Sequence, residues 1–176
     1  IKNKGLLLAD VNGVNLVHLF RHGVPDREYL ELLYEAGLKQ IVFPIESGSQ
    51  RILDKYATGK LNLEKMDVVH LVKVAKGIGI ICPVNMMIGF PDETEEEIMQ
   101  SVELAKQAIT AGADYVTFFI PIPFPGSQLY DIAIRDGYLK PDFDPDIMNW
   151  KNGVMENTTV PKDRIVELRD WAWETV

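Results

Sequence analysis

The chain has 176 residues, 47% of them hydrophobic and 25% charged, which is the composition of one ordinary globular domain. Its formal net charge of -8 argues against nucleic acid as a partner, since a net acidic surface repels the phosphate backbone. No apolar stretch approaches the roughly 20 residues that a membrane span needs, and residues 1–4 lead into no cleavable apolar segment. We therefore expect neither a membrane nor a nucleic-acid partner.

Apolar runs alternate with helical patterns over the first 120 residues. The predicted strands span residues 6–9, 40–45, 80–88 and 114–120. The predicted helices start at the N-caps Asp26, Asn62 and Thr94 and end at Gly37, at Gly77 or Gly79, and at Gly112. Thr94 and Glu97 form a capping box. Near-continuously apolar strands that alternate with helices are typical of parallel βαβ units.

The pattern changes after Pro121. Residues 121–127 contain three prolines and predict neither a central strand nor a helix. A short helix is predicted from about Ser127 to Arg135, followed by a mostly irregular segment over 140–157. A last helix starts at Pro161, and its predicted buried face consists of Ile165, Leu168, Trp171 and Ala172.

Polar side chains occur where the predicted strands end, and parallel α/β folds bind ligands at that edge. Glu46 directly follows one strand, and Asn85 interrupts the next. Each residue has two interpretations: its side chain bonds to neighbouring protein groups, or it contacts a ligand. Gly89-Phe90-Pro91 either lets a flat ligand approach the backbone or forms a plain strand-to-helix turn.

Metal-ligand patterns are weak. The acidic residues between Asp92 and Glu97 lie at a predicted helix N-terminus, where the macrodipole explains them. His18 and His22 have i,i+4 spacing, but Gly23 and Pro25 favour an irregular element there. We therefore expect no metal site formed by this chain.

Cys82 is the single cysteine. One thiol excludes a disulfide framework, and it excludes a zinc site or iron–sulfur cluster held by cysteines of this chain alone. A lone cysteine favours a reducing compartment, and we expect a cytoplasmic protein.

Several segments in order carry a resemblance to a known family. They are residues 45–53, Gly59-Lys60, residues 87–96 and residues 123–130. Together they resemble the second half of the core of radical S-adenosylmethionine (radical SAM) iron–sulfur enzymes. The similarity covers roughly residues 5–140 and is greatest to the branch that carries an upstream cobalamin (B12)-binding domain. The family's fifth-strand pattern, Gly-x-Ile-x-Gly-x-x-Glu, is kept in part, at Asn85, Met87, Gly89 and Asp92.

The resemblance implies an α/β fold: parallel βα units that form about four strands of an open (β/α)6 partial TIM barrel, truncated at the N-terminus. Residues 1–140 would be the C-terminal portion of that barrel, and residues 141–176 a loop plus a C-terminal helix packed on it. The family's Cys-x-x-x-Cys-x-x-Cys loop follows the first strand and does not occur in this sequence.

The resemblance also implies a function. The full-length protein would be an oxidoreductase or transferase that binds SAM and a 4Fe-4S cluster for radical or methyl-transfer chemistry on a small molecule. Cobalamin would be a further cofactor in the cobalamin-associated branch. This chain alone is expected to be inactive, because the cluster ligands would lie in the missing N-terminal half, its natural partner.

The resemblance assigns cofactor contacts residue by residue: Glu46, Ser47, Lys60, Asn85, Gly89, Phe90 and Ile120. Glu46 would contact SAM, Lys60 would face the SAM carboxylate, and Asn85 would lie near the ribose hydroxyls. Gly89, Phe90 and Ile120 would border the adenine.

Two other functions remain open from the residues. One is a TIM-like aldolase or phosphate-binding barrel, against which the missing glycine-rich phosphate loop argues. The other is a non-catalytic α/β module that binds a partner through its open sheet edge. A cut barrel would leave residues 6–9 as a free edge, which predicts a homo-oligomer through that edge or through the barrel interior.

Overall fold

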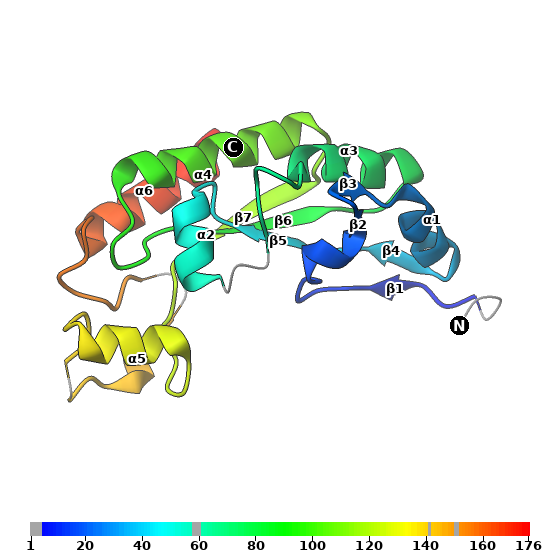
Figure 1. Ribbon diagram of the computed structural model, residues 1–176. Helices are drawn as coiled ribbons and strands as arrows, with labels where there is room; N and C mark the ends of the chain where they lie inside the picture. Colours follow the sequence, from blue (N-terminus) through cyan, green and yellow to red (C-terminus); the bar gives the residue numbers. More distant parts are fainter. Residues whose placement is uncertain (1–4, 58–60, 141, 150–151) are drawn as a thin grey trace.

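The computed structural model describes residues 5–57, 61–140, 142–149 and 152–176 (Figure 1). Two of its sheets are parallel. Strand β1 (Leu8–Ala9) pairs with β4 (Leu38–Gln40), and β5 (Phe43–Glu46), β6 (Pro83–Met87) and β7 (Tyr115–Phe119) form a three-stranded parallel sheet. A bridge between Gln40 and Ile81 connects the two sheets. The expected α/β fold with parallel strands is therefore confirmed.

The strand predicted at 40–45 is two strands with a break at Ile41 and Val42. The break has a physical cause: the amide of Val42 donates to the carboxylate of Asp10 at 3.1 Å instead of to a strand partner. The same carboxylate accepts from the amide of Gly13 at 3.1 Å. Asp10 thus holds the loop after β1 against the strand break.

The described helices start at side-chain caps, except α6, which follows Pro161 without a capping hydrogen bond. They are α1 (Arg27–Glu35), α2 (Gln50–Tyr56), α3 (Val68–Ile78), α4 (Glu95–Thr110), α5 (Gln128–Arg135) and α6 (Lys162–Thr175). The predicted caps Asp26 and Thr94 are confirmed, including the capping box of Thr94 with Glu97. Short 3-10 helices occur at η1 (Leu16–Leu19) and η2 (Pro145–Ile147), and β2 (Phe20–Arg21) and β3 (Val24–Pro25) form an antiparallel hairpin.

Two predictions about helices were wrong. Asn62 caps a turn, accepting from the amide of Lys65 at 3.0 Å, whereas α3 starts after Asp67, which accepts from the amide of His70 at 2.8 Å. Asp67 supplies the capping carboxylate at which the helix begins, and Val68 directly after it is buried in the core. Trp171 is 38% exposed; its ring lies 5.5 Å from the ammonium of Lys106 rather than in the core.

One face of the sheet is covered by helices. Figure 1 shows α3, α4 and α6 in one layer above β5–β7. The alternate side chains that form the core on this face are fully buried: Phe43, Ile45, Val84, Met86 and Phe118. On the opposite face the register partners Pro44, Asn85 and Thr117 have intermediate exposure. We call this second surface the open face of the sheet.

The segment after β7 forms a second, smaller hydrophobic cluster. Ala133, Leu139 and Met155 are buried in it, with Tyr130 and Phe143 packed around them. The expected boundary at residue 140 falls inside this cluster, whereas α6 beyond it packs on β7 and contributes Ile165 to the main core.

Strand β1 lies at the edge of its pair. Among the described residues no strand pairs with its outer side, and Leu7 beside it is 77% exposed. Self-association through this edge stays a prediction.

Candidate functional site

A pocket of about 390 Å³ lies at the carboxyl ends of β1 and β5. Three parts of the chain line it: the loop over residues 12–16, the strand end over residues 44–46, and α2 with the following residues. Its polar groups include the amides of Asn12 and Asn15 and the carboxylate of Glu46. A pocket lined by both polar and apolar groups suits a ligand that has both kinds of surface.

Glu46 is held in an unusual backbone conformation at the edge of this pocket. Its φ is +73°, which L-residues with a long side chain rarely adopt. The register between β5 and β6 shifts here, so that Glu46 lies opposite Met86. Glu46 lines the pocket together with Pro44 and Ile45, and Ile45 is also a buried core residue.

The turn after Glu46 is anchored on α4. Gly48 donates its amide to the hydroxyl of Ser101 at 2.8 Å, and the hydroxyl of Ser47 lies 3.3 Å from the same oxygen. Ser49 caps α2 and donates its hydroxyl to Glu97 at 2.7 Å. The side chain of Ser47 is fully buried. It therefore supports the turn and does not face the pocket.

Asn85 lies in the middle of β6, on the open face. It pairs in register with Pro44 of β5 and Thr117 of β7. Glu46 and Asn85 lie on the adjacent parallel strands β5 and β6. Asn85 does not line the pocket itself, so the two side chains belong to neighbouring parts of one surface.

The backbone just after β6 is held by a buried carboxylate, that of Glu93. Glu93 is fully buried, and one of its carboxylate oxygens accepts from the amides of Gly89 at 2.6 Å and Phe90 at 3.1 Å. Its other oxygen is buried without a hydrogen-bond partner among the described residues. Burial raises the pKa of Glu93 to about 7, an effect that the two amides only partly offset.

Phe90 is buried at 4% exposure and stacks on Tyr56, with ring centroids 4.8 Å apart. Tyr56 lines the pocket, so Phe90 supports the pocket from behind. Ile120, directly after β7, is 2% exposed. Lys60 lies outside the described residues, so its predicted place opposite the SAM carboxylate stays a prediction.

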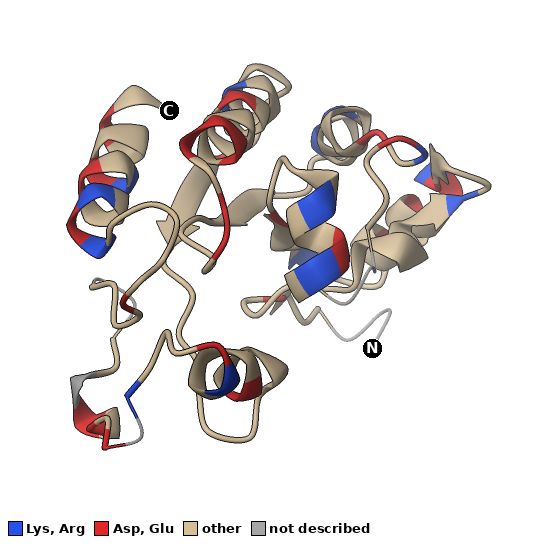
Figure 2. Ribbon diagram, turned by 60° about the vertical axis from the view of Figure 1, so that its left-hand side comes forward, with Lys and Arg blue, Asp and Glu red and all other residues tan. Residues whose placement is uncertain are grey.

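The acidic segment before α4 binds the basic side of α2 (Figure 2). Arg51 bridges Asp92 at 2.8 Å and Glu97 at 2.5 Å, and Lys55 binds Asp92 at 2.7 Å. The hydrogen bond from Arg51 is the largest effect on Glu97 and lowers its pKa to about 2. Burial opposes ionisation of Asp92, but hydrogen bonds from Lys55, Tyr56 and Arg51 outweigh it and lower the pKa of Asp92 to about 2.

Sequence reasoning missed most of the pocket wall. It did not predict α2, although Ser49 is a good N-cap and Ile52 and Leu53 follow at helical spacing. It explained the acidic segment by the helix dipole alone, whereas Arg51 and Lys55 four residues apart were a signal for a facing pair of carboxylates. Nothing in the sequence marked Glu93 as the buried member of that segment.

The residues present fit SAM better than a cluster. The pocket offers amide and carboxylate groups next to the apolar side chains of Leu16 and Leu53, which suits a molecule with a charged end and a flat ring. Cys82 is fully buried in the helix-covered core, and burial raises the pKa of its thiol to about 12. A thiol in that state is not a metal ligand. Within the described parts of the chain no group of three or more His, Cys, Asp or Glu residues could hold a metal ion.

No helix in the described parts of the chain is both long enough and apolar enough to cross a membrane.

Comparison with known proteins gives the family of the chain. Residues 6–105 match the radical SAM superfamily. The chain is 35% identical over 136 residues to a cytidylyl-2-hydroxyethylphosphonate methyltransferase of Streptomyces wedmorensis, covering 74% of this chain and 24% of that protein. It is 33% identical over 142 residues to an uncharacterized methyltransferase of Pyrococcus horikoshii, covering 81% of this chain and 27% of that protein.

A tRNA-2-methylthio-N(6)-dimethylallyladenosine synthase of Deinococcus radiodurans is 33% identical over 88 residues, which cover 49% of this chain and 16% of that protein. The chain thus spans about a quarter of the length of the two methyltransferases it matches. The matched family region contains β1 to most of α4, including the pocket, Glu46 and Asn85. The chain belongs to the radical SAM superfamily of enzymes.

Proposed function

We propose that this chain is the SAM-binding, C-terminal portion of a (β/α)6 partial barrel in a radical SAM enzyme that transfers a methyl group or starts radical chemistry on a small molecule. One observation carries the proposal. The pocket at the carboxyl ends of β1 and β5 combines polar groups with an apolar wall and adjoins the open face that carries Asn85. The names of two relatives, the methyltransferases that are 35% and 33% identical, favour methyl transfer, and with it cobalamin as a further cofactor.

Each residue has a defined task in this proposal. Glu46 would accept hydrogen bonds from the amino group of SAM, and Asn85 would bond the ribose hydroxyls from the next strand. Gly89, Phe90 and Ile120 would border the adenine, and Lys60 would neutralise the carboxylate. Leu16, Leu53 and Tyr56 would exclude water from the bound molecule.

The reductive chemistry is supplied by a 4Fe-4S cluster when it is bound. Because the chain contains one cysteine and that thiol is buried, we infer that the cluster ligands come from residues outside it. A buried free thiol also fits the reducing, cytoplasmic location that we propose.

Equilibrium dialysis of the anaerobically reconstituted protein that contains this chain, with radiolabelled SAM, tests the proposal. Glu46→Ala and Asn85→Ala should each weaken SAM binding by roughly 1–3 kcal/mol, because each removes one hydrogen-bonding group from the ligand. Glu103→Ala on the outer side of α4 and Asn152→Ala are matched controls at exposed positions. If both site variants bind SAM as well as the controls do, the proposed site is wrong.

A further inference from the structure

Asp92 accepts hydrogen bonds from three side chains of one short helix, α2. Its Oδ2 atom accepts from Arg51 at 2.8 Å and from Lys55 at 2.7 Å, and its Oδ1 atom accepts from the phenol of Tyr56 at 2.6 Å. Its backbone carbonyl accepts a further bond from Arg51 at 2.8 Å. All three donors lie on α2, so one residue of the β6–α4 connection binds the exposed side of the whole helix.

The helix that Asp92 holds is also a wall of the pocket. Leu53, Tyr56 and Ala57 line the pocket, and we call these residues the α2 wall. Asp92 does not line the pocket. Any effect of Asp92 on a molecule in the pocket therefore acts through the α2 wall, above all through Tyr56, which it bonds directly.

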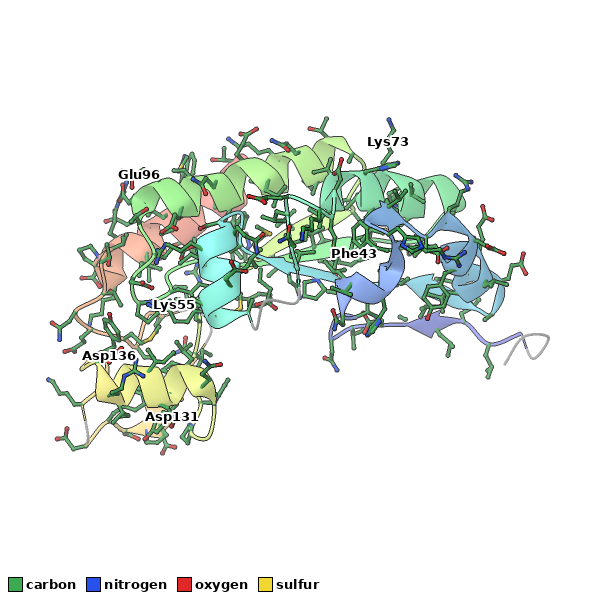
Figure 3. The ribbon with its side chains drawn as sticks, viewed as in Figure 1. Phe43, Lys55, Lys73, Glu96, Asp131 and Asp136 are labelled. Atoms are coloured by element: carbon green, nitrogen blue, oxygen red, sulfur yellow. The ribbon has the colours of Figure 1, made fainter. Side chains whose placement is uncertain are left out.

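A helix as short as α2 depends on such contacts. It has seven residues, and helices of that length are not stable by themselves in water. Two of its side chains, Ile52 and Leu53, are buried in the core, and they hold one side of the helix. The opposite side carries Arg51 and Lys55, whose side chains are 48% and 44% exposed. Figure 3 shows Lys55 projecting from α2 on the side away from the layer of α3 and α4.

These contacts fix the orientation of α2 as well as attaching it to the rest of the chain. Tyr56 is held at its hydroxyl by Asp92 and along its ring by the stacked Phe90, with an interplanar angle of 15°. Arg51 is held at the same time by Asp92 and by Glu97, the capping-box residue of α4. The helix is thereby joined to the first turn of α4 and to the end of β6, which is itself clamped by Glu93.

We propose that Asp92 is a positioning residue for SAM binding: it fixes α2 so that the α2 wall closes on the ligand. This inference rests on the proposed function of the pocket. Asp92 would make no contact with SAM, and its effect would follow from the place and rigidity of Tyr56 and Leu53.

The test compares two variants of Asp92 with a matched control in the reconstituted protein that contains this chain. Asp92→Ala removes every side-chain bond to α2, and Asp92→Glu keeps the charge and can restore part of them. Asp114→Ala is the control, because Asp114 also binds a lysine, Lys76 at 2.8 Å, and a backbone amide, Cys82 at 2.6 Å. Asp114 lies before β7, at the opposite edge of the sheet from the pocket.

Two readouts separate the steps of the argument. Hydrogen exchange of the α2 amides without ligand measures the anchoring, and equilibrium dialysis with radiolabelled SAM measures its consequence. Asp92→Ala should speed exchange in residues 50–56 and weaken SAM binding by about tenfold, with partial recovery in Asp92→Glu. Asp114→Ala should change neither readout, although it lowers the thermal midpoint of the protein.

The inference is overturned if Asp92→Ala leaves α2 exchange unchanged, or if it loosens α2 while SAM binds as before. An equal loss of SAM binding in Asp114→Ala also overturns it, because the effect would then be general destabilisation. If the unchanged protein binds no SAM, the proposed function fails and this inference fails with it. The exchange data distinguish that outcome, because α2 anchoring is measured without ligand.

Discussion

Ile165 of α6 packs directly against the backbone of Gly89 at the end of β6. A Cβ atom on Gly89 would lie 2.5 Å from Cγ2 of Ile165, and the φ of Gly89 is +94°. Both facts require glycine at this position. The contact connects the C-terminal helix to the strand end next to the pocket, so α6 contributes to the shape of the site without reaching it.

Gly89→Ala should therefore lower the free energy of unfolding by about 2–4 kcal/mol, from backbone strain and from the clash together. Gly126→Ala is the matched control: its φ is +86°, and nothing lies within 4 Å of the added Cβ. It should cost about 1–2 kcal/mol, from strain alone. Urea denaturation of both variants measures the difference. Equal losses of unfolding free energy would contradict the prediction, because they would show that Ile165 moves away from the added Cβ at no cost.

Ser101→Ala tests the anchor of the turn that follows Glu46. It leaves the part-buried amide of Gly48 without its acceptor, so the free energy of unfolding should fall by about 1–3 kcal/mol. Thr110→Ala on the same helix removes a hydroxyl that bonds Lys106 at an exposed position, and it should change stability by less than about 0.5 kcal/mol. A Ser101→Ala variant as stable as Thr110→Ala would contradict the anchoring.

Glu93 predicts a distinctive pH dependence. Because burial raises its pKa from 4.5 to about 7 in the native state, the native state binds this proton more tightly than the unfolded state does. Its stabilising contribution is present below about pH 4.5 and is lost as the pH rises through about 7. Glu93→Gln removes this titration while keeping the shape.

The free energy of unfolding of Glu93→Gln should therefore rise relative to that of the unchanged protein between pH 4.5 and 7, by up to about 3 kcal/mol. Guanidinium denaturation at pH 5 and at pH 8 measures this, with Glu96→Gln as the charge-matched control at an exposed position. A pH-independent difference would show that Glu93 is not buried as a titrating carboxyl.

Cys82→Ala should leave the iron content of the reconstituted protein unchanged. The thiol is fully buried in the helix-covered core, and its pKa is raised to about 12, so it cannot serve as a thiolate ligand. Iron and labile sulfide are measured per chain, with circular dichroism as the check that the variant is folded. Loss of iron from a folded variant would place Cys82 at the cluster after all.

The sequence predicted those parts of the fold whose signals are local. Asp26 and Thr94 are caps directly followed by apolar residues at helical spacing, and their helices start as expected. Asn62 was the wrong cap because it caps a real turn five residues before the true cap at Asp67, and Asn and Asp are equally good N-cap residues. The strand break at Val42 depends on Asp10, 32 residues earlier, and no local pattern shows it.

The candidate site was predictable where it follows a strand. Glu46 was identified because a carboxylate directly after an apolar run lies at the ligand-binding edge of a parallel sheet, and it does line the pocket. Tyr56 and the loop from Asn12 to Asn15 were not identified, because their place depends on long-range contacts such as the bond between Tyr56 and Asp92. The sequence could not predict the direction of the Ser47 side chain either, because it depends on the distant Ser101.

Substitutions on the two faces of the sheet have different consequences for the protein. Substitutions on the helix-covered face, at Phe43 or Phe118, would alter packing and be removed because the chain no longer folds. Substitutions on the open face, at Asn85 or Thr117, would alter what the surface binds and leave the core intact. Such a chain can acquire a new substrate through substitutions on the open face while the helix-covered face keeps the fold stable. Its binding specificity can therefore change faster than its fold.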